Sequence, residues 1–298
     1  MTPPAPSGIA SNESAMSGEA RRARAIAWIK NVHDDVTALF TRLDRGSEFR
    51  EDTWDRAEGG GGHSRVMIDG ATFEKGGVNR SVVYGRLPAL AAAKLGGRGV
   101  SDGESQFFAT GVSLVFHPRS PMIPTVHLNV RYFELSDDDG NLRDAWYGGG
   151  TDITPMHPFP DDVKHFHRTL ASICDRFHPS LHTRFKPWCD EYFRNTHRNN
   201  ETRGCGGIFF DHVRPGEDAS GMDAATTMAF VDAIGRSLTE AYGPIVERRR
   251  DEPYGERERN FQLVRRGRYV EFNLVHDRGT HFGLHTAARI ESVLMSLP

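Results

Sequence analysis

The chain has 298 residues, of which 38% are hydrophobic and 26% are charged, and its formal net charge is −3. This composition is typical of a soluble globular protein, and no apolar run is long enough to span a bilayer. The small negative charge argues against a nucleic-acid-binding surface over the whole protein. The three cysteines include no CxxC pair, so we expect no disulfide framework. These features predict a cytoplasmic protein without a nucleic-acid partner or an integral membrane segment.

The N-terminal residues 1–18 are rich in Pro, Ser, Ala and Gly and lack the apolar segment of a signal peptide. We therefore expect a disordered tail, followed by a single domain over residues 19–298. Residues 19–43 place apolar side chains three and four positions apart, which predicts an amphipathic helix. These side chains are Ile26, Ile29, Val32, Val36, Phe40 and Leu43.

Glycines punctuate the segment that follows this helix. The four glycines at 59–62 precede no Gly-Lys-Ser/Thr, which excludes a phosphate-binding loop. Gly70 and the pair Gly76-Gly77 predict breaks between short strands. The strands are expected at 66–68, 71–73 and 81–84. A short helix is expected over 88–95.

Two alternating runs, at 113–117 and 126–133, predict strands in the middle of the chain. One face of the second strand is aliphatic, with Val126, Leu128 and Val130. The other face carries His127, Asn129 and Arg131, spaced roughly 6.5–7 Å apart along the strand. An imidazole, an amide and a guanidinium in one row fit a carboxylate-bearing ligand. A polar face that contacts solvent or neighbouring charges is the alternative interpretation.

A carboxylate follows three glycines shortly after this strand, in the run Gly148-Gly149-Gly150-Thr151-Asp152. Glycines let the backbone adopt a positive φ and approach a ligand closely. They also lose more conformational entropy on folding than other residues do. We therefore expect Asp152 to belong to a binding site rather than to a packing contact.

The remaining chain predicts helices and strands in mixed order. Helices are expected over 161–177, 187–197 and 224–242, the last of which ends at Gly243-Pro244. A buried strand is expected to end at Asp211, two further strands to lie within 261–275, joined at Arg266-Gly267, and a final helix to open at 286–289. Adjacent runs of strands with helices around them predict an α+β fold, with a mainly antiparallel sheet.

From about Arg21 onward the chain contains an ordered set of distinctive sequence blocks, among them FEKGGVN, HPRSPMIPTVHLNVRYFE, WYGGGTDITP, RGCGGIFFD and RRGRYVEFNLVHDRGT. On these blocks the chain resembles the aerobic, oxygen-dependent coproporphyrinogen III oxidases. The resemblance implies a homodimer of single catalytic domains, each with a large sheet flanked on both faces by helices. It also implies the conversion of two propionates of coproporphyrinogen III to vinyls, which gives protoporphyrinogen IX in haem biosynthesis.

The resemblance assigns roles to individual residues of this sequence. Asp152 would face the pyrrole N–H groups and favour the loss of one proton, and His127 would be the proton donor. Arg131 would be catalytic and would also orient a propionate. The implied substrate-binding set is Ser113, Asn129, Val130, Arg131, Arg203, Ala287, Ala288 and Arg289. For Arg203, a structural salt bridge beside a glycine turn is the alternative interpretation. Ala287 and Ala288 replace two glycines that are usual in the family, and His276 replaces a usual Trp or Tyr.

The resemblance implies O₂ as the oxidant and no flavin, haem or nicotinamide. A divalent metal is sometimes assigned in the family, at positions that match His117, His127, His167 and His197. These histidines come from scattered elements without the grouping of a tight metal site. A metal-dependent dioxygenase acting on a polycarboxylate is the alternative function, and a non-catalytic tetrapyrrole-binding or RNA-binding protein is a third.

Overall fold

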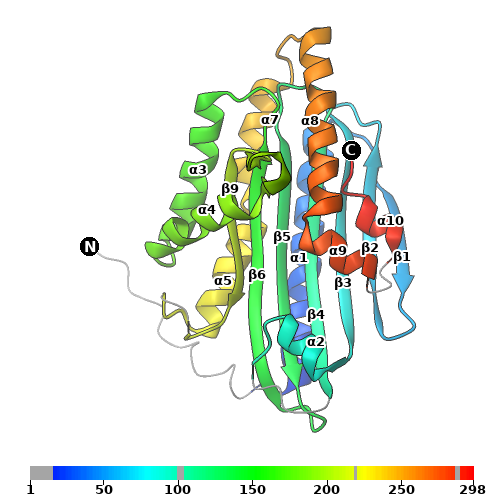
Figure 1. Ribbon diagram of the computed structural model, residues 1–298, viewed down its shortest axis with the longest axis vertical. Coiled ribbons are helices and arrows are strands. Elements are labelled where there is room, and N and C mark those ends of the chain that lie inside the picture. The colour runs from blue at the N-terminus through cyan, green and yellow to red at the C-terminus, as the bar shows by residue number, and fades with distance from the viewer. Residues whose placement is uncertain (1–15, 99–103, 218–219, 286–288) are drawn as a thin grey trace.

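A seven-stranded antiparallel sheet forms the centre of the computed structural model, which describes residues 16–98, 104–217, 220–285 and 289–298 (Figure 1). The strand order is β1-β2-β3-β4-β5-β6-β9, and every pairing is antiparallel. The strands are β1 Arg50–Asp55, β2 Gly60–Ile68, β3 Phe73–Pro88, β4 Glu104–Pro118, β5 Thr125–Ser136, β6 Leu142–Thr154 and β9 Gly206–Val213. The predicted α+β fold with an antiparallel sheet is therefore confirmed.

Helices cover both faces of this sheet (Figure 1). The back layer contains α1 Gly18–Asp44, α5 Ala224–Gly235, α6 Leu238–Ala241 and α7 Gly243–Arg249. The front layer contains α2 Ala89–Lys94, α8 Glu256–Val275, α9 Arg278–His285 and α10 Ile290–Leu294. Beside β9 lie α3 Pro160–Asp175, α4 Ser180–Tyr192, β7 Arg194–Asn195, the 3-10 helix η1 Thr196–Arg198 and β8 Glu201–Thr202. Within the described residues, no helix is both long and apolar enough to cross a membrane.

The main hydrophobic core lies between the sheet and the back layer. Phe40 of α1 stacks on Phe116 of β4, with ring centroids 3.6 Å apart, and Val130 of β5 is completely buried. A Cβ added to Gly235 of α5 would lie 3.5 Å from the Val130 side chain. Because a shift of one residue would expose this apolar face, the core fixes the register of β5. The alternate residues of β5 must then point to the front.

The back layer also buries a histidine, which makes stability depend on pH. His33 of α1 has no exposed side-chain surface, and burial together with Arg65 lowers its pKa from 6.5 to about 4. His63 and Arg80 lower this pKa further, whereas Asp34 raises it. Below pH 6.5 the unfolded chain binds a proton that the folded chain does not bind, so acid favours unfolding.

We predict that the free energy of unfolding falls by about 1–2 kcal/mol between pH 7 and pH 5 because of His33. Urea denaturation at the two pH values measures this fall. The His33→Gln variant cannot titrate and should show a smaller fall. An unchanged fall in that variant would assign the pH dependence to other groups.

Three predicted boundaries in the sheet are wrong, because glycines that read as turns lie inside strands. The glycines at 60–62 belong to β2, and β3 runs without interruption through Gly76-Gly77. A Cβ at Gly76 would lie 2.1 Å from the Phe116 ring, and one at Gly62 would lie 2.1 Å from the Trp54 ring. These glycines make room for aromatic side chains on neighbouring strands.

Two predicted helices also differ from the structure. The helix expected over 187–197 begins at Ser180 instead, with Pro187 inside it, because Leu181, Phe185 and Cys189 form its buried stripe. The helix expected over 224–242 breaks after Gly235. Gly243-Pro244 opens α7 rather than ending a helix, since proline fits the first turn, where no N–H partner is needed.

The largest error concerns residues 261–275, where two strands were expected and the structure has the long helix α8. The buried side of α8 carries Gln262, Arg266, Tyr269 and Phe272, at spacings of three and four. Gln262 donates to the Pro118 carbonyl (3.0 Å), and Arg266 contacts Glu74 (3.0 Å). Two residues of this buried stripe are polar, which hid the helical period in the sequence.

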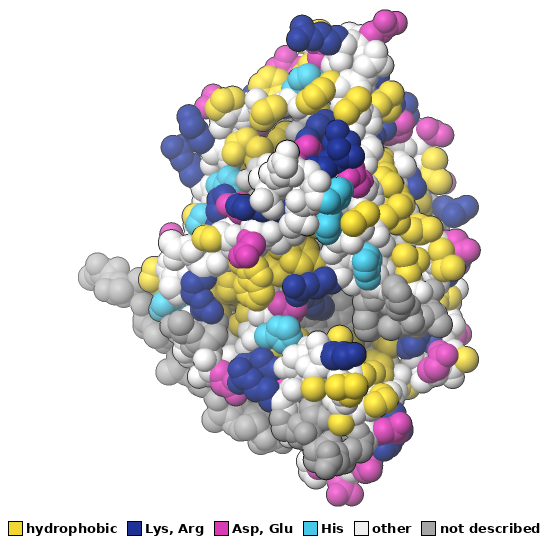
Figure 2. Space-filling view, viewed as in Figure 1, with side chains coloured by type: hydrophobic (Ala, Val, Ile, Leu, Met, Phe, Trp, Pro, Cys, Tyr) yellow, Lys and Arg dark blue, Asp and Glu magenta, His cyan; other side chains and the backbone are white. Residues whose placement is uncertain are grey.

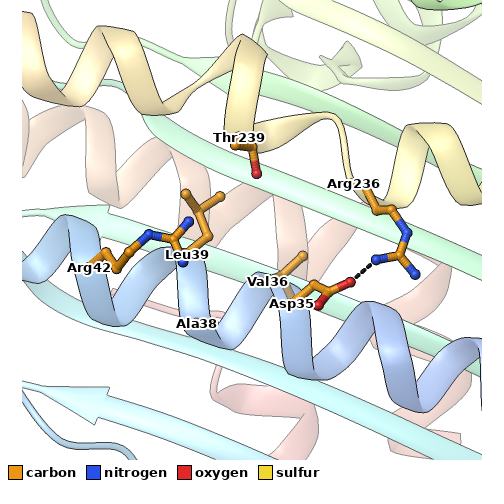
Figure 3. A pocket seen from close by; sticks show the side chains of 7 residues that line it. All are labelled: Asp35, Val36, Ala38, Leu39, Arg42, Arg236 and Thr239. Carbon is orange, nitrogen blue, oxygen red and sulfur yellow. Dashed lines mark ion pairs between the residues drawn. The ribbon is translucent and has the colours of Figure 1, made fainter.

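Two hollows lie in the back layer, between α1 and the α5–α6 segment. One has a volume of about 270 Å³, and the ion pair between Asp35 and Arg236 crosses it (Figure 3). The other lies beside Trp28 and Asp232. None of the predicted site residues lines either hollow. The candidate site is on the opposite face of the sheet.

Candidate active site

The front face brings the predicted polar residues together on adjacent strands. Strand β5 pairs with β6 so that three polar residues face three residues of the glycine run: His127 opposite Asp152, Asn129 opposite Gly150, and Arg131 opposite Gly148. On the other side of β5, Ser113 of β4 lies opposite Asn129. Directly opposed residues share a face and are the closest cross-strand neighbours. The predicted row of side chains therefore exists, with Asp152 next to His127.

Asp152 forms a buried ion pair with Arg203. The Arg203 guanidinium donates to Asp152 Oδ2 at 2.5 Å, and both side chains are 4% exposed. His127 Nδ1 lies 3.4 Å from the same oxygen and 3.3 Å from the guanidinium nitrogen. Burial raises the pKa of Asp152, but Arg203 and His127 outweigh burial and hold the pKa at about 2. Asp152 is therefore an anion throughout the physiological range.

His127 is neutral in this environment. Burial lowers the pKa of its imidazole below 6.5, and the positive charge of Arg203 lowers it further, against the opposing effect of Asp152. Among the described residues, no group forms a hydrogen bond with its buried Nε2. A neutral imidazole donates from one nitrogen and accepts at the other. His127 can thus transfer a proton without carrying a permanent charge.

Aromatic rings enclose the Arg203 guanidinium, which lies 3.8 Å above the Phe193 ring, 5.2 Å from Phe272 and 5.5 Å from Tyr269. Tyr269 of α8 also stacks on the His127 imidazole, with centroids 5.2 Å apart and planes 18° apart. No role in the site was predicted for these rings. The only signal for Tyr269 and Phe272 was their helical spacing within a segment that was interpreted as strands.

The other end of the row is more open to solvent. Arg131 donates to Asn129 Oδ1 at 2.7 Å and pairs with Asp211 Oδ2 at 2.9 Å. The side chains of Arg131 and Asp211 are 34% and 22% exposed. Figure 2 shows basic, acidic and histidine side chains together in the middle of this face. In the sequence, Asp211 was predicted only as the end of a strand, so its contact with Arg131 was missed.

Other predicted substrate-binding residues lie elsewhere. The Val130 side chain belongs to the core on the back face, so it cannot contact a ligand on the front. Arg289 pairs with Asp52 of β1. Ala287 and Ala288 lie outside the described residues. Of the implied substrate-binding set, the structure places Ser113, Asn129, Arg131 and Arg203 around the row.

The glycine triplet does not use its conformational freedom as expected. None of the three glycines has a positive φ. A Cβ at Gly149 would lie 2.6 Å from the Asn129 carbonyl oxygen, and one at Gly150 would lie 2.4 Å from the Ile208 carbonyl oxygen. Gly149 and Gly150 therefore allow the neighbouring strands to approach β6 closely. The triplet carries Asp152 on a regular strand rather than on a ligand-binding loop.

The four candidate metal ligands have separate environments. His117 contacts the Ser296 carbonyl oxygen (2.8 Å), and His167 contacts the Cys205 carbonyl oxygen (3.1 Å). His197 lies next to His276, with 2.7 Å between their ring nitrogens. The part of the chain that the structure describes contains no group of three or more His, Cys, Asp or Glu side chains placed to hold a metal ion. His117 and His127 both contact the Tyr269 ring.

Known proteins resemble this chain over nearly its whole length. A family model described as coproporphyrinogen III oxidase matches residues 24–298. "Oxygen-dependent coproporphyrinogen-III oxidase" of Parasynechococcus marenigrum (strain WH8102) is 50% identical in an alignment that covers 94% of this chain and 80% of that protein. "Oxygen-dependent coproporphyrinogen-III oxidase, chloroplastic" of Glycine max is 48% identical over 291 residues, which cover 96% of this chain and 74% of that protein. With the fold and the polar row in place, these matches show that the chain belongs to the coproporphyrinogen III oxidase family.

Proposed function

We propose that this enzyme carries out the oxygen-dependent oxidative decarboxylation of coproporphyrinogen III to protoporphyrinogen IX. Each reacting propionate, –CH2–CH2–COO⁻, becomes a vinyl group and releases CO₂, one proton and two electrons, and O₂ accepts the electrons. The observation that carries the proposal is one sheet face with a buried anion at one end and a guanidinium at the other. Arg131 follows His127 by four residues on β5, a separation of about 13 Å.

Each end of this row matches one part of such a substrate. Arg131 and Asn129 would bind a propionate, since a guanidinium forms strong hydrogen bonds with carboxylates. Asp152 would accept hydrogen bonds from the pyrrole N–H groups. With a pKa of about 2, it is a weak base, so we assign it the role of a fixed negative charge. That charge stabilises the positive charge that develops on an electron-rich ring when O₂ removes electrons.

His127 would move the proton at this centre. Its imidazole contacts Asp152 and is stacked on Tyr269, so its position is fixed by two neighbours. A positioned proton-transfer group contributes typically ~10²–10⁴-fold to a rate. We propose O₂ as the only oxidant and no organic cofactor.

A single assay tests this function. Purified enzyme is given coproporphyrinogen III in air and under anaerobic conditions, each with and without a chelator, and protoporphyrinogen IX is quantified after oxidation to the fluorescent porphyrin. We expect product in air, with or without the chelator, and none without O₂. Product formation without O₂ would refute the proposal, and loss of activity that Fe²⁺ or Mn²⁺ restores would favour the metal-dependent alternative.

We also propose that the enzyme is a homodimer and works in the cytoplasm. The family resemblance supports the dimer. The name of the Parasynechococcus relative gives no compartment, whereas the name of the Glycine max relative includes a plastid location. Light scattering during size-exclusion chromatography measures the mass in solution, and a mass of one chain would rule out a stable dimer.

A further inference from the structure

We propose that Asp211 is a positioning residue, which holds the Arg131 guanidinium in the orientation that binds a substrate carboxylate. The inference rests on the proposed function, because it concerns the end of the site that would hold a propionate. It adds a residue from β9 to the row of side chains on β4, β5 and β6. Three independent features of the structure support it: the contacts of Arg131, the register and bulge of β9, and the absence of a side chain at Gly148.

The first feature is that two acceptors fix the Arg131 guanidinium. One terminal nitrogen donates to Asn129 Oδ1 (2.7 Å), and the other pairs with Asp211 Oδ2 (2.9 Å). Asn129 is itself fixed, since its amide donates to the Val112 carbonyl oxygen (3.2 Å). These two contacts use two of the five N–H donors of a guanidinium. Among the described residues no other acceptor contacts this guanidinium, so its remaining donors can bind a carboxylate that approaches from solvent.

The second feature is the register of β9, which places Asp211 on the front face opposite Gly148, together with a bulge at His212 that supports the Asp211 carboxylate. The pairing of β6 with β9 shifts between Tyr147↔Val213 and Gly149↔Phe210, so that Asp211 and His212 together stand opposite Gly148. His212 has a φ of +51°, which is uncommon for a residue other than glycine. Its ring contacts the Leu95 carbonyl oxygen (2.9 Å), and its backbone N–H donates to Asp211 Oδ1 (3.0 Å). Bulges of this kind are common next to active sites.

The third feature is the space over Gly148. A Cβ at this position would lie 2.6 Å from Asp211 Oδ1 and 2.7 Å from Arg131 Nε. The ion pair therefore lies directly on the backbone of β6, and a methyl group there would push both side chains away. Because both contacts are with the ends of flexible side chains, the sheet itself can tolerate the change. Gly148→Ala thus perturbs the orientation of the pair without removing either charge.

Stability does not account for this arrangement. Both side chains reach solvent, and ion pairs between solvent-accessible groups contribute little to folding. The charge of Asp211 also weakens the attraction of Arg131 for an incoming carboxylate. A favourable effect of Asp211 on binding must therefore come from the orientation of the guanidinium. Weaker binding after loss of Asp211 would indicate positioning, whereas tighter binding would indicate only the loss of a repelling charge.

The test uses coproporphyrin III, the stable fluorescent tetracarboxylate, as the binding probe, together with turnover of coproporphyrinogen III. Asp211→Ala should raise the Kd of the probe and the KM of the substrate about tenfold, the loss expected for a charge-assisted hydrogen bond, with a smaller change in kcat. Asp211→Asn keeps an acceptor oxygen and should recover part of the loss. Gly148→Ala should raise Kd in the same direction.

A double-mutant cycle separates positioning from other roles. In the Arg131→Ala background, Asp211→Ala should change Kd by less than about twofold, because Asp211 acts through Arg131. Asp35→Ala breaks a partly exposed ion pair with Arg236 in the back layer and serves as the matched control, with an unchanged Kd. Thermal melting of each variant verifies that it is folded.

The proposal is overturned if Asp211→Ala binds the probe as tightly as the native enzyme does. It is also overturned if Asp211→Ala raises the Kd by the same factor with and without Arg131. Failure of the proposed function gives a different result. In that case the native enzyme would not turn over coproporphyrinogen III, whereas the binding cycle with coproporphyrin III would still report on Asp211.

Discussion

Replacing Asp152 by alanine is expected to reduce turnover by about 10³-fold or more, because it removes the fixed negative charge at the reacting ring. The same change leaves the buried guanidinium of Arg203 without its partner, 2.5 Å away in the native protein. Breaking a buried ion pair on one side costs about 3–5 kcal/mol of folding free energy. Steady-state assays and urea denaturation measure the two effects separately.

A paired substitution distinguishes loss of chemistry from loss of folding. In the double variant Asp152→Leu and Arg203→Met, both charges are replaced by apolar side chains of similar size, which is often neutral for stability. Phe193 and Phe272 already surround the guanidinium, so an apolar chain has partners there. We expect stability to return while activity does not. Turnover of Asp152→Ala at the native rate would contradict the proposed role of the carboxylate.

The sequence predicted those parts of the fold in which one face is purely apolar. The helix α1 and the strand β5 were both correct, because each has a continuous apolar face that packs in the back core. Strand β3 was divided in two because Gly76 reads as a turn in isolation. Gly76 is glycine because the Phe116 ring of the neighbouring strand occupies the space of a side chain. This tertiary contact is not visible in the local sequence.

Helix α8 shows why the front layer was harder to predict. Its buried face includes Gln262 and Arg266, which are 1% and 8% exposed. Both side chains donate to the carbonyl oxygen of Pro118, the last residue of β4. The helical period is therefore visible only when polar residues are counted as buried. Their partners lie more than a hundred residues away in the sequence.

The candidate site was predictable where one strand supplies it and not where separate segments meet. The row from His127 to Arg131 followed from simple alternation. The pairing of Asp152 with Arg203 joins residues 51 positions apart, and the sequence offered a role for Arg203 only through family resemblance. Asp211 lies next to Arg131 because β9 pairs with β6, with Phe209 opposite Gly150 and Phe210 opposite Gly149. The local sequence of β9 does not show which strand is its neighbour.

Replacing His127 by glutamine is expected to lower kcat by about 10²–10⁴-fold, the contribution of a positioned proton-transfer group. Glutamine keeps a polar side chain next to Asp152 but has no titrating nitrogen. His165→Gln is the matched control, because His165 lies on α3 and contacts only the Glu240 carbonyl oxygen among its described hydrogen-bond partners. This control should retain native activity. Native activity in His127→Gln would exclude the imidazole from the proton transfer.

The pH profile tests which protonation state of His127 is active. Burial and Arg203 lower its pKa below 6.5, so the imidazole is neutral above that pH. If the neutral form acts, kcat/KM should be constant from about pH 6.5 to pH 8.5 and should fall only in acid. If the protonated form acted, kcat/KM would instead fall about tenfold per pH unit over this range.

The Tyr269 ring gives this profile a structural control. Tyr269→Phe keeps the ring that stacks on His127 at 5.2 Å, whereas Tyr269→Leu removes it and lets the imidazole turn away from Asp152. We expect Tyr269→Phe to retain the native profile, and Tyr269→Leu to lower kcat and move the acid limb. If kcat/KM of Tyr269→Leu falls at the same acid pH as in the native enzyme, then Asp152 and Arg203 fix the imidazole without the ring. These two residues are the other groups in contact with its Nδ1.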